Sequence, residues 1–479
     1  MSMSMRRLAR QGLTMLVLTG SLIVWETAAG AMTLAEAVDL ALKDNPGLAS
    51  FRLREKMAET RLTEATGRYL PILSVGESFI STNNPLNAFG ILLNEALITS
   101  SSFSNLNALN NPANTQTFGF QAQVAETIFS GGSRFHAVRA ASRRIRAGTE
   151  TVRWKEEELV YEAARAYLDS LLAVDRVTLF EELVRLAAEE EKIAKDRVST
   201  GKAVRAELLS ARVHLSHQKT RLLEAEKEAG LSRDRLTQLL GNMRSSDHPL
   251  PDSSVLSRAD AVYRTMNGKG VDNLVADALS ERPDYLSLKK EISARKEMAS
   301  AKLAGFLPQV SAQGLYNEYN PTLAWGKQDY TVIGQVQWNL FNGLSDRESR
   351  QRASLSVEEA LERERELKDT LIYEVRAAYA EAGSLHEALK VDEERMAEET
   401  EERRIVHERY QVGLVRTSDI LRSDVAYRRA SLRLLADRTH FVEAVLAERK
   451  AIGLLSENDP VFRGGAMASS NLRSGKDGS

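Results

Sequence analysis

At 479 residues the chain has room for two or three globular domains, and its formal net charge of −2 gives no electrostatic basis for binding nucleic acid. It contains no cysteine, which excludes thiol catalysis, disulfides, thiolate zinc sites and a lipid-modified N-terminal cysteine. A chain without thiols also suits a compartment in which thiols would be oxidised.

The N-terminus has the pattern of a secretory signal peptide. Three arginines at positions 6, 7 and 10 precede a short apolar run at residues 13–25, and Ala29-Gly30-Ala31 forms a cleavage site of small residues. We therefore assign residues 1–31 to a signal peptide cleaved after Ala31. An uncleaved anchor is the alternative, but the run is shorter than the roughly 20 apolar residues that span a bilayer.

The remainder of the chain is a duplication. Its second part repeats the order of landmarks in the first, at an offset of 237 for Pro46 and Pro283 that becomes 212 from Phe129 and Phe341 onward. The change of offset places one insertion in the first copy, before Phe129. Two copies of one supersecondary unit are therefore predicted, at residues 32–241 and 273–455.

Each unit is predicted to begin with a helix and to continue into two strands. A capping box at residues 33–36 opens the first helix, Asn45-Pro46 breaks or kinks its early turns, and Leu70-Pro71 ends it. The apolar period then changes from 3.6 to 2, with Glu77 as the exception on the apolar side. This alternation predicts strands, each as long as a tilted membrane strand, at about 70–83, 116–129, 307–317 and 330–341.

Long helices follow the strands in both copies. Turn residues at Gly131, Gly132 and Gly343 convert strand into helix, and tight turns at Gly201 and Gly413 separate each long helix from a returning one. The dense mixed charge of these long helices indicates that their outer faces are solvated. Helices are expected at 133–200, 205–240, 345–412 and 418–455, an irregular connection with room for a short helix at 242–272, and a disordered tail at 456–479.

Four amphipathic strands cannot close a barrel by themselves. In lipid their unpaired edge amides would each cost several kcal/mol. A barrel shared between copies resolves this problem, and three copies give twelve strands, within the range of outer-membrane barrels. The predicted fold is therefore mainly α with a membrane β-barrel portion. It is a duplicated helix–two strands–long helix–helix unit, in which a trimeric 12-stranded barrel continues as an α-helical barrel.

Several short motifs, together with the duplication, carry a family resemblance. They are the opening Leu-x-x-Ala-x-x-x-Ala with Asn-Pro, the Leu-Pro before each strand pair, the Phe-Ser-Gly-Gly turn, and Tyr-Gln-Val-Gly at 410–413 leading into Ser-Asp-Ile-Leu at 418–421. From about Thr33 to Leu455 the chain resembles the outer-membrane efflux and type I secretion channels typified by TolC. The resemblance implies a homotrimer with its barrel in outer-membrane lipid, its helices spanning the periplasm, and an equatorial belt that includes residues 242–272.

The resemblance also implies a passive exit duct. An inner-membrane pump of the RND or ABC type would deliver substrates through a periplasmic adaptor (membrane fusion) protein, and the pump rather than this chain would choose the cargo. No P-loop, GxGxxG or Ser-His-Asp arrangement is apparent, so we expect neither an enzyme nor a cofactor. The alternative is a soluble periplasmic coiled-coil adaptor or structural scaffold, which would leave the alternating strands and the duplication unexplained.

The insertion of the first copy, at about 84–115, lies between two strands at the end opposite the helices. It is expected to be an extracellular loop. Residues 89–98 have room for a short amphipathic helix that caps or lines the exit, and a passive polar loop is the alternative.

The resemblance places a periplasmic gate at the two hairpin turns. By position, Asp419 matches the first acidic ring of the family's constriction, Glu207 is its equivalent in the first copy, and Tyr410 matches a tyrosine of the closing network. The second acidic position holds Arg422, which weakens the case for strong cation selectivity. Arg416 lies next to the position of the family's linking arginine. Capping of a helix is the alternative role of Asp419.

A metal site is not expected. His214 and His217 lie on one face of a predicted helix, a spacing that can bind a metal. However, no third ligand is near them in the sequence, and the surrounding side chains are densely charged.

Overall fold

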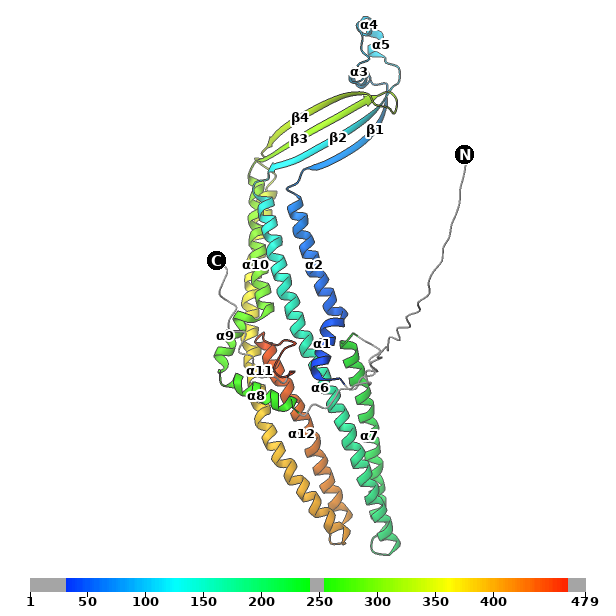
Figure 1. Cartoon of the computed structure of the whole chain (residues 1–479), viewed down its shortest axis with the longest axis vertical. Helices are drawn as coiled ribbons and strands as arrows, with labels where there is room; N and C mark the ends of the chain where they lie inside the picture. Colours follow the sequence, from blue (N-terminus) through cyan, green and yellow to red (C-terminus); the bar gives the residue numbers. More distant parts are fainter. Residues whose placement is uncertain (1–31, 242–253, 464–479) are drawn as a thin grey trace, which may run out of the picture.

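The computed structural model describes residues 32–241 and 254–463, so the predicted signal peptide lies outside the described residues. Figure 1 shows an elongated molecule with a curved sheet at one end, long helices running to the other end, and short helices crossing near the middle. Within the two described ranges, no helix is both long and apolar enough to cross a membrane.

The elements form two matching series. The first repeat contains α1 (Leu34–Asp44), α2 (Pro46–Gly67), β1 (Ile72–Thr82), β2 (Thr115–Phe129), α6 (Ser133–Ser199) and α7 (Arg205–Leu239). The second contains α9 (Val271–Glu281), α10 (Pro283–Ala301), the 3₁₀ turn η1 (Lys302–Phe306), β3 (Gln309–Asn320), β4 (Lys327–Gln337), α11 (Ser345–Gln411) and α12 (Thr417–Ala451). Outside the repeat pattern lie α3 (Pro85–Asn94), α4 (Ser100–Ser104) and α5 (Leu106–Asn110) of the insertion and α8 (Val255–Asn267) between the repeats.

The first two helices are delimited by their caps. The Glu36 amide donates to the Thr33 hydroxyl at 3.3 Å and the Thr33 amide donates to the Glu36 carboxylate at 2.8 Å, so the capping box forms. Asn45 ends α1 and caps α2, whose first residue is Pro46. The break therefore falls at the Asn-Pro pair, as the sequence indicates.

All four strands form one antiparallel sheet in the order β1-β2-β3-β4. The register places Val75 opposite Ala122 and Val332 opposite Gly314, so the apolar residues of neighbouring strands share one face. In the part of the chain that the structure describes, β1 and β4 each pair with a single strand. The sheet of one copy therefore has two open edges.

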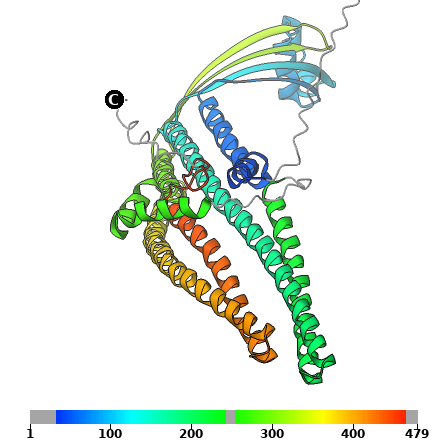
Figure 2. The same cartoon turned by 60° about the horizontal axis from the view of Figure 1, so that its bottom comes forward.

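The long helices are equal in the two repeats. α6 and α11 each have 67 residues, about 100 Å of helix, and α7 and α12 each have 35. Figure 2 shows α6 with α7 and α11 with α12 as two separate hairpins. All bounds fall within one residue of the predicted helices except the end of α12, which stops at Ala451 instead of residue 455. Gly453 has a φ of +73° there, and such left-handed backbone terminates a helix.

The strand-to-helix turns use left-handed backbone at two successive residues. Gly131 and Gly132 have φ angles of +62° and +83°, and Gly343 and Leu344 have +55° and +68°. Leucine in this conformation costs about 1–2 kcal/mol, which the surrounding structure must offset.

The helix of the insertion differs from the predicted one. α3 begins four residues before residue 89, because Asn84 accepts hydrogen bonds from the amides of Leu86 and Asn87 and Pro85 occupies the first helical position. It ends at Asn94 instead of 98. Figure 1 places the insertion beyond the end of the sheet that is farthest from the long helices.

The main hydrophobic core lies at mid-length, where the short helices pack on the long ones. Tyr167 of α6, Leu274 of α9 and both Phe441 and Leu446 of α12 are fully buried in it. The connection predicted to be irregular contributes α8, of which Ala259 joins the same core, while residues 242–253 lie outside the described residues. This cluster fixes the two repeats to each other.

The segment after α12 also packs into this core, so the prediction of a disordered tail is wrong for residues 456–463. Val461 and Phe462 are buried, and Asp459 accepts a hydrogen bond from Arg449 Nε at 2.7 Å. Composition indicated disorder because serine and glycine are the commonest residues of the tail, but two apolar side chains are enough to anchor its first part. Residues 464–479 of the predicted tail lie outside the described residues.

Glu157 of α6 is a buried carboxyl next to this core, and its replacement by glutamine should change how stability depends on pH. Burial raises its pKa from 4.5 to about 8, against the opposing charge of Arg153. The folded state therefore holds a proton that the unfolded state releases, so stability present below pH 4.5 is lost as the pH rises through about 8.

Glu157→Gln should leave the thermal unfolding midpoint unchanged near pH 5 and raise it by a few degrees at pH 9. Thermal melts of the detergent-solubilised protein across this range would measure the effect. Glu162→Gln, an exposed neighbour on the same helix, serves as the control and should shift nothing. A parallel shift of the Glu157→Gln melts at every pH would contradict the assignment.

Candidate functional site at the helix tips

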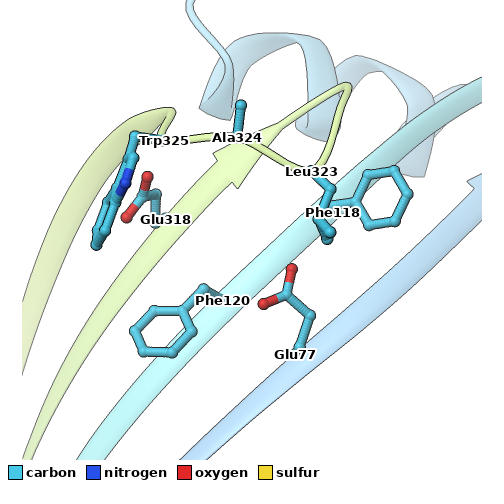
Figure 3. Close-up of a pocket in the computed structure, with 7 residues that line it drawn as sticks. All are labelled: Glu77, Phe118, Phe120, Glu318, Leu323, Ala324 and Trp325. Atoms are coloured by element: carbon cyan, nitrogen blue, oxygen red, sulfur yellow. The ribbon is translucent and has the colours of Figure 1, made fainter. Parts of the chain in front are cut away.

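A hollow of about 330 Å³ lies on the apolar face of the sheet (Figure 3). The register places Glu77 and Glu318 on either side of Phe120, so the same face carries a second acid two strands away from Glu77. Residues 323–325 of the β3–β4 turn also line the hollow. Glu318 is buried and accepts a hydrogen bond from the Gly326 amide, whereas Glu77 is exposed. Among the residues that line the hollow, Glu77 and Glu318 carry the titratable groups, and the others are apolar.

The two hairpin tips, at the opposite end of the molecule, have the same geometry. Gly201 follows α6 with a φ of +71° and Gly413 follows α11 with a φ of +80°. The next amide donates to a carbonyl of the last helical turn, at 2.8 Å from Lys202 and 2.9 Å from Leu414. Both turns are thus Schellman motifs, which reverse the chain within a few residues and place the return helices beside the long ones.

The predicted gate acids occupy equivalent positions in the return helices. Glu207 is the third residue of α7 and Asp419 the third of α12, and both side chains are half-buried. Asp419 Oδ2 accepts a hydrogen bond from the Arg416 amide at 3.0 Å, so the structure gives this carboxylate the capping role kept as the alternative. Arg422 lies one turn further along α12 and is exposed. A negative charge in a first helical turn is favoured by the helix dipole.

Tyr410 joins the two hairpins. It is fully buried, and the guanidinium carbon of Arg197 lies 5.1 Å from its ring centroid. Because Arg197 lies in the last turn of α6 and Tyr410 in the last turn of α11, this cation–π contact connects tips from different repeats. The sequence analysis did not identify Arg197. The one signal available was that its equivalent in the second copy, Arg409, directly precedes the predicted gate residue Tyr410. A contact between repeats cannot be deduced from either copy alone.

Buried ionisable groups connect the helices a few turns above the tips. Arg403 of α11 donates to Asp424 of α12 at 2.8 Å, with both side chains largely buried. Burial, and after it the neighbouring Asp424 carboxyl, raise the pKa of Glu190 of α6 well above its ordinary value. Burial lowers the pKa of His214 of α7. Glu190, His214 and Asp424 converge from three helices, and they include one of the two histidines that the sequence singled out.

Comparison with known proteins identifies a family. The sequence pattern of the family described as "Outer membrane efflux protein" matches residues 37–242 and 274–454, which are most of both repeats. The outer membrane efflux protein BepC of Brucella suis biovar 1 (strain 1330) is 22% identical over 294 residues, which cover 61% of this chain and 55% of BepC. The match thus spans about half the length of this relative.

Solved structures share the fold. CusC superposes with a TM-score of 0.73 at 16% identity, covering 88% of this chain and 92% of CusC. The Campylobacter jejuni outer membrane channel CmeC gives 0.72 at 17% identity, covering 89% and 87%. The open state of the Neisseria gonorrhoeae outer membrane channel MtrE gives 0.71 at 16% identity, covering 89% and 90%. At these identities the similarity establishes the fold.

Proposed function

Because the chain belongs to the outer membrane efflux protein family, we propose that three copies of it form a passive exit duct for an efflux or type I secretion system. The family match confirms the resemblance inferred from the sequence and the localisation in the outer membrane with a periplasmic part. The mainly helical fold with one four-stranded sheet is that of channel proteins. The trimer, its 12-stranded barrel and its partners are the proposal.

The observation that carries the proposal is a sheet that one copy leaves incomplete. Val332 and Val336 of β4 and Val75 of β1 are about two-thirds or more exposed on the apolar face. Both edge strands also present unpaired backbone groups, which are unfavourable in lipid. Pairing β1 of one copy with β4 of the next satisfies both edges and turns the apolar face toward the membrane.

The opposite face of the sheet is suited to water. Gln121 Nε2 donates to Asn317 Oδ1 at 3.1 Å, and Asn317 Nδ2 donates to Asp329 Oδ1 at 2.8 Å, so polar side chains form a ladder across three strands. In a closed barrel this ladder would line the lumen. Such a lumen lets polar cargo pass without contact with lipid.

The hairpins would continue the duct through the periplasm to a mouth at the tips. Asp419 and Glu207 would surround the narrowest point, with Arg422 and Arg416 near it and Tyr410 holding the hairpins together. Exposed apolar residues at the turns, among them Val412 and Leu414, offer a docking surface for a periplasmic adaptor. Transport energy would come from an RND or ABC pump in the inner membrane.

The experiment is extraction of the mature protein from outer membranes, with the mass of the detergent complex and the conductance in planar bilayers as readouts. A trimer that conducts ions supports the duct, whereas a soluble monomer would support the alternative of a periplasmic coiled-coil adaptor or scaffold.

Two neighbouring substitutions sharpen this test. Val332→Arg places a charge on the apolar face, at a cost of about 2–4 kcal/mol per chain if it lies near the bilayer midplane. It should strongly reduce the trimer recovered from the outer membrane. Ile333→Arg, on the opposite face of the same strand, should be tolerated. Equal loss with both variants would contradict the assignment of the two faces.

A further inference from the structure

A cluster of three potential metal ligands lies between the hairpins. Glu190 comes from α6, His214 from α7 and Asp424 from α12, and one ligand atom from each lies within 4.8 Å of the others. Glu190 and His214 are each nine residues from the α6–α7 turn boundaries, and Asp424 is seven residues into α12. The cluster therefore lies two to three helical turns above the tips.

Glu190 lacks the partners that a buried carboxylate needs. It is 1% exposed, and within the described chain neither of its oxygens has a hydrogen-bond donor. The group it faces, Asp424, is also an acceptor and already receives the Arg403 guanidinium at 2.8 Å. An uncompensated buried carboxylate costs several kcal/mol, so a proton or a cation must lie between the two acids.

An approach to the cluster is present. A hollow of about 520 Å³ lies between α7 and α12, and His214, His217, Gln218 and Leu421 are among the residues that line it. Arg428 also lines it, but its guanidinium donates to Gln218 Oε1 at 3.2 Å. Water and a small ion can therefore reach His214 without unfolding of the hairpins.

We propose that Glu190, His214 and Asp424 bind one divalent transition-metal ion of the zinc class. One imidazole with two carboxylates suits Zn²⁺ and its neighbours, whereas Mg²⁺ and Ca²⁺ prefer oxygen ligands alone. Three protein ligands leave a fourth position for water from the hollow. The positive charge of Arg403 on Asp424 opposes the ion and limits its affinity. His217 is outside the cluster.

The ion would tie the α6–α7 hairpin to α12. Since α12 belongs to the α11–α12 hairpin of the other repeat, a bound metal would restrain the relative movement of the two hairpins near the tips. That restraint matters for transport only if the proposed duct is correct, whereas metal binding itself can be tested without any channel activity.

The test uses the full mature protein in detergent, purified with a tag that binds no metal and treated with a chelator. Equilibration with Zn²⁺, gel filtration and elemental analysis should give one zinc per chain, and competition with a chromophoric chelator should give the affinity. Co²⁺ in place of Zn²⁺ should produce visible absorption. His214→Ala should weaken zinc binding at least about tenfold, whereas His217→Ala should leave it unchanged.

Glu190→Gln separates ligand loss from misfolding. Glutamine has a similar shape and removes the buried carboxylate, so this variant should melt at or above the wild-type temperature while losing zinc. The proposal is overturned if wild type holds no more zinc than His214→Ala, which would mean that a proton alone occupies the cluster. It is also overturned if His217→Ala abolishes binding equally, which would mean a surface histidine pair.

Discussion

Replacing Gly241 or Gly453 by alanine is expected to prevent formation of a stable folded chain. Both glycines have left-handed backbone, with φ angles of +69° and +73°. A Cβ on Gly241 would lie 2.3 Å from the carbonyl oxygen of Asp44, and one on Gly453 would lie 2.7 Å from the Cα of Arg282. The obstructing atoms are backbone, which cannot rotate away as a side chain can.

The same packing contact between a loop and a helix end therefore occurs once in each repeat. Each glycine ends a return helix where the loop between the first two helices of its own repeat packs against it. Asn45 Nδ2 donates to the Leu239 carbonyl at 2.8 Å in the first repeat, and Arg282 donates to the Ala451 carbonyl in the second. Alanine would separate loop and helix and break these hydrogen bonds, in addition to the strain of its own backbone.

Thermal melts and the yield of assembled protein measure this effect. We expect a fall of more than 10 °C, or no assembly, since losses above about 4 kcal/mol are reached only by such severe mechanisms. Gly230→Ala is the matched control, because Gly230 lies within α7 with open space around it and alanine favours helix there. If Gly453→Ala melted at the same temperature as the wild type, this packing contact would not have the importance assigned to it.

Local features of this fold could be predicted from sequence because local interactions fix them. The capping box at Thr33, the break at Asn45 and the glycines of the two tips each depend on neighbours within a few residues. The strands could be predicted because apolar and polar residues alternate along the sequence. The long helices could be predicted because their sequences are long, helical in pattern and free of proline. The duplication also made the prediction of element boundaries firmer, since the same order of helices and strands could be read in each of the two copies.

Contacts between the repeats could not be predicted. The Arg197–Tyr410 contact and the cluster around His214 depend on how two hairpins lie side by side. That arrangement follows from the packing of the core at mid-length, where residues more than 200 positions apart meet. For the same reason Val461 gave no signal, because its partners belong to other parts of the chain.

Removing the charges at the tips is expected to change the ion preference of the proposed channel. A trimer would place six carboxylates, from Asp419 and Glu207 of each chain, around one mouth. A ring of like charge in a narrow pore raises the local concentration of counter-ions. Asp419→Asn with Glu207→Gln should therefore reduce the preference for cations over anions several-fold in bilayer recordings. Asparagine can still accept the hydrogen bond of the Arg416 amide, so the cap of α12 is kept.

Removing the positive charge of Arg422, at the same tip, is expected to change the ion preference in the opposite direction. Arg422 is exposed one turn from Asp419, so Arg422→Gln should increase cation preference if both side chains face the mouth. Glu64→Gln, an exposed acid near the sheet that pairs with Arg68, controls for a loss of charge far from the tips. If the double variant conducts with the wild-type ion preference, Asp419 only caps its helix and the constriction lies elsewhere in the duct. If Arg422→Gln also has no effect, the electrostatics of the tips do not govern passage.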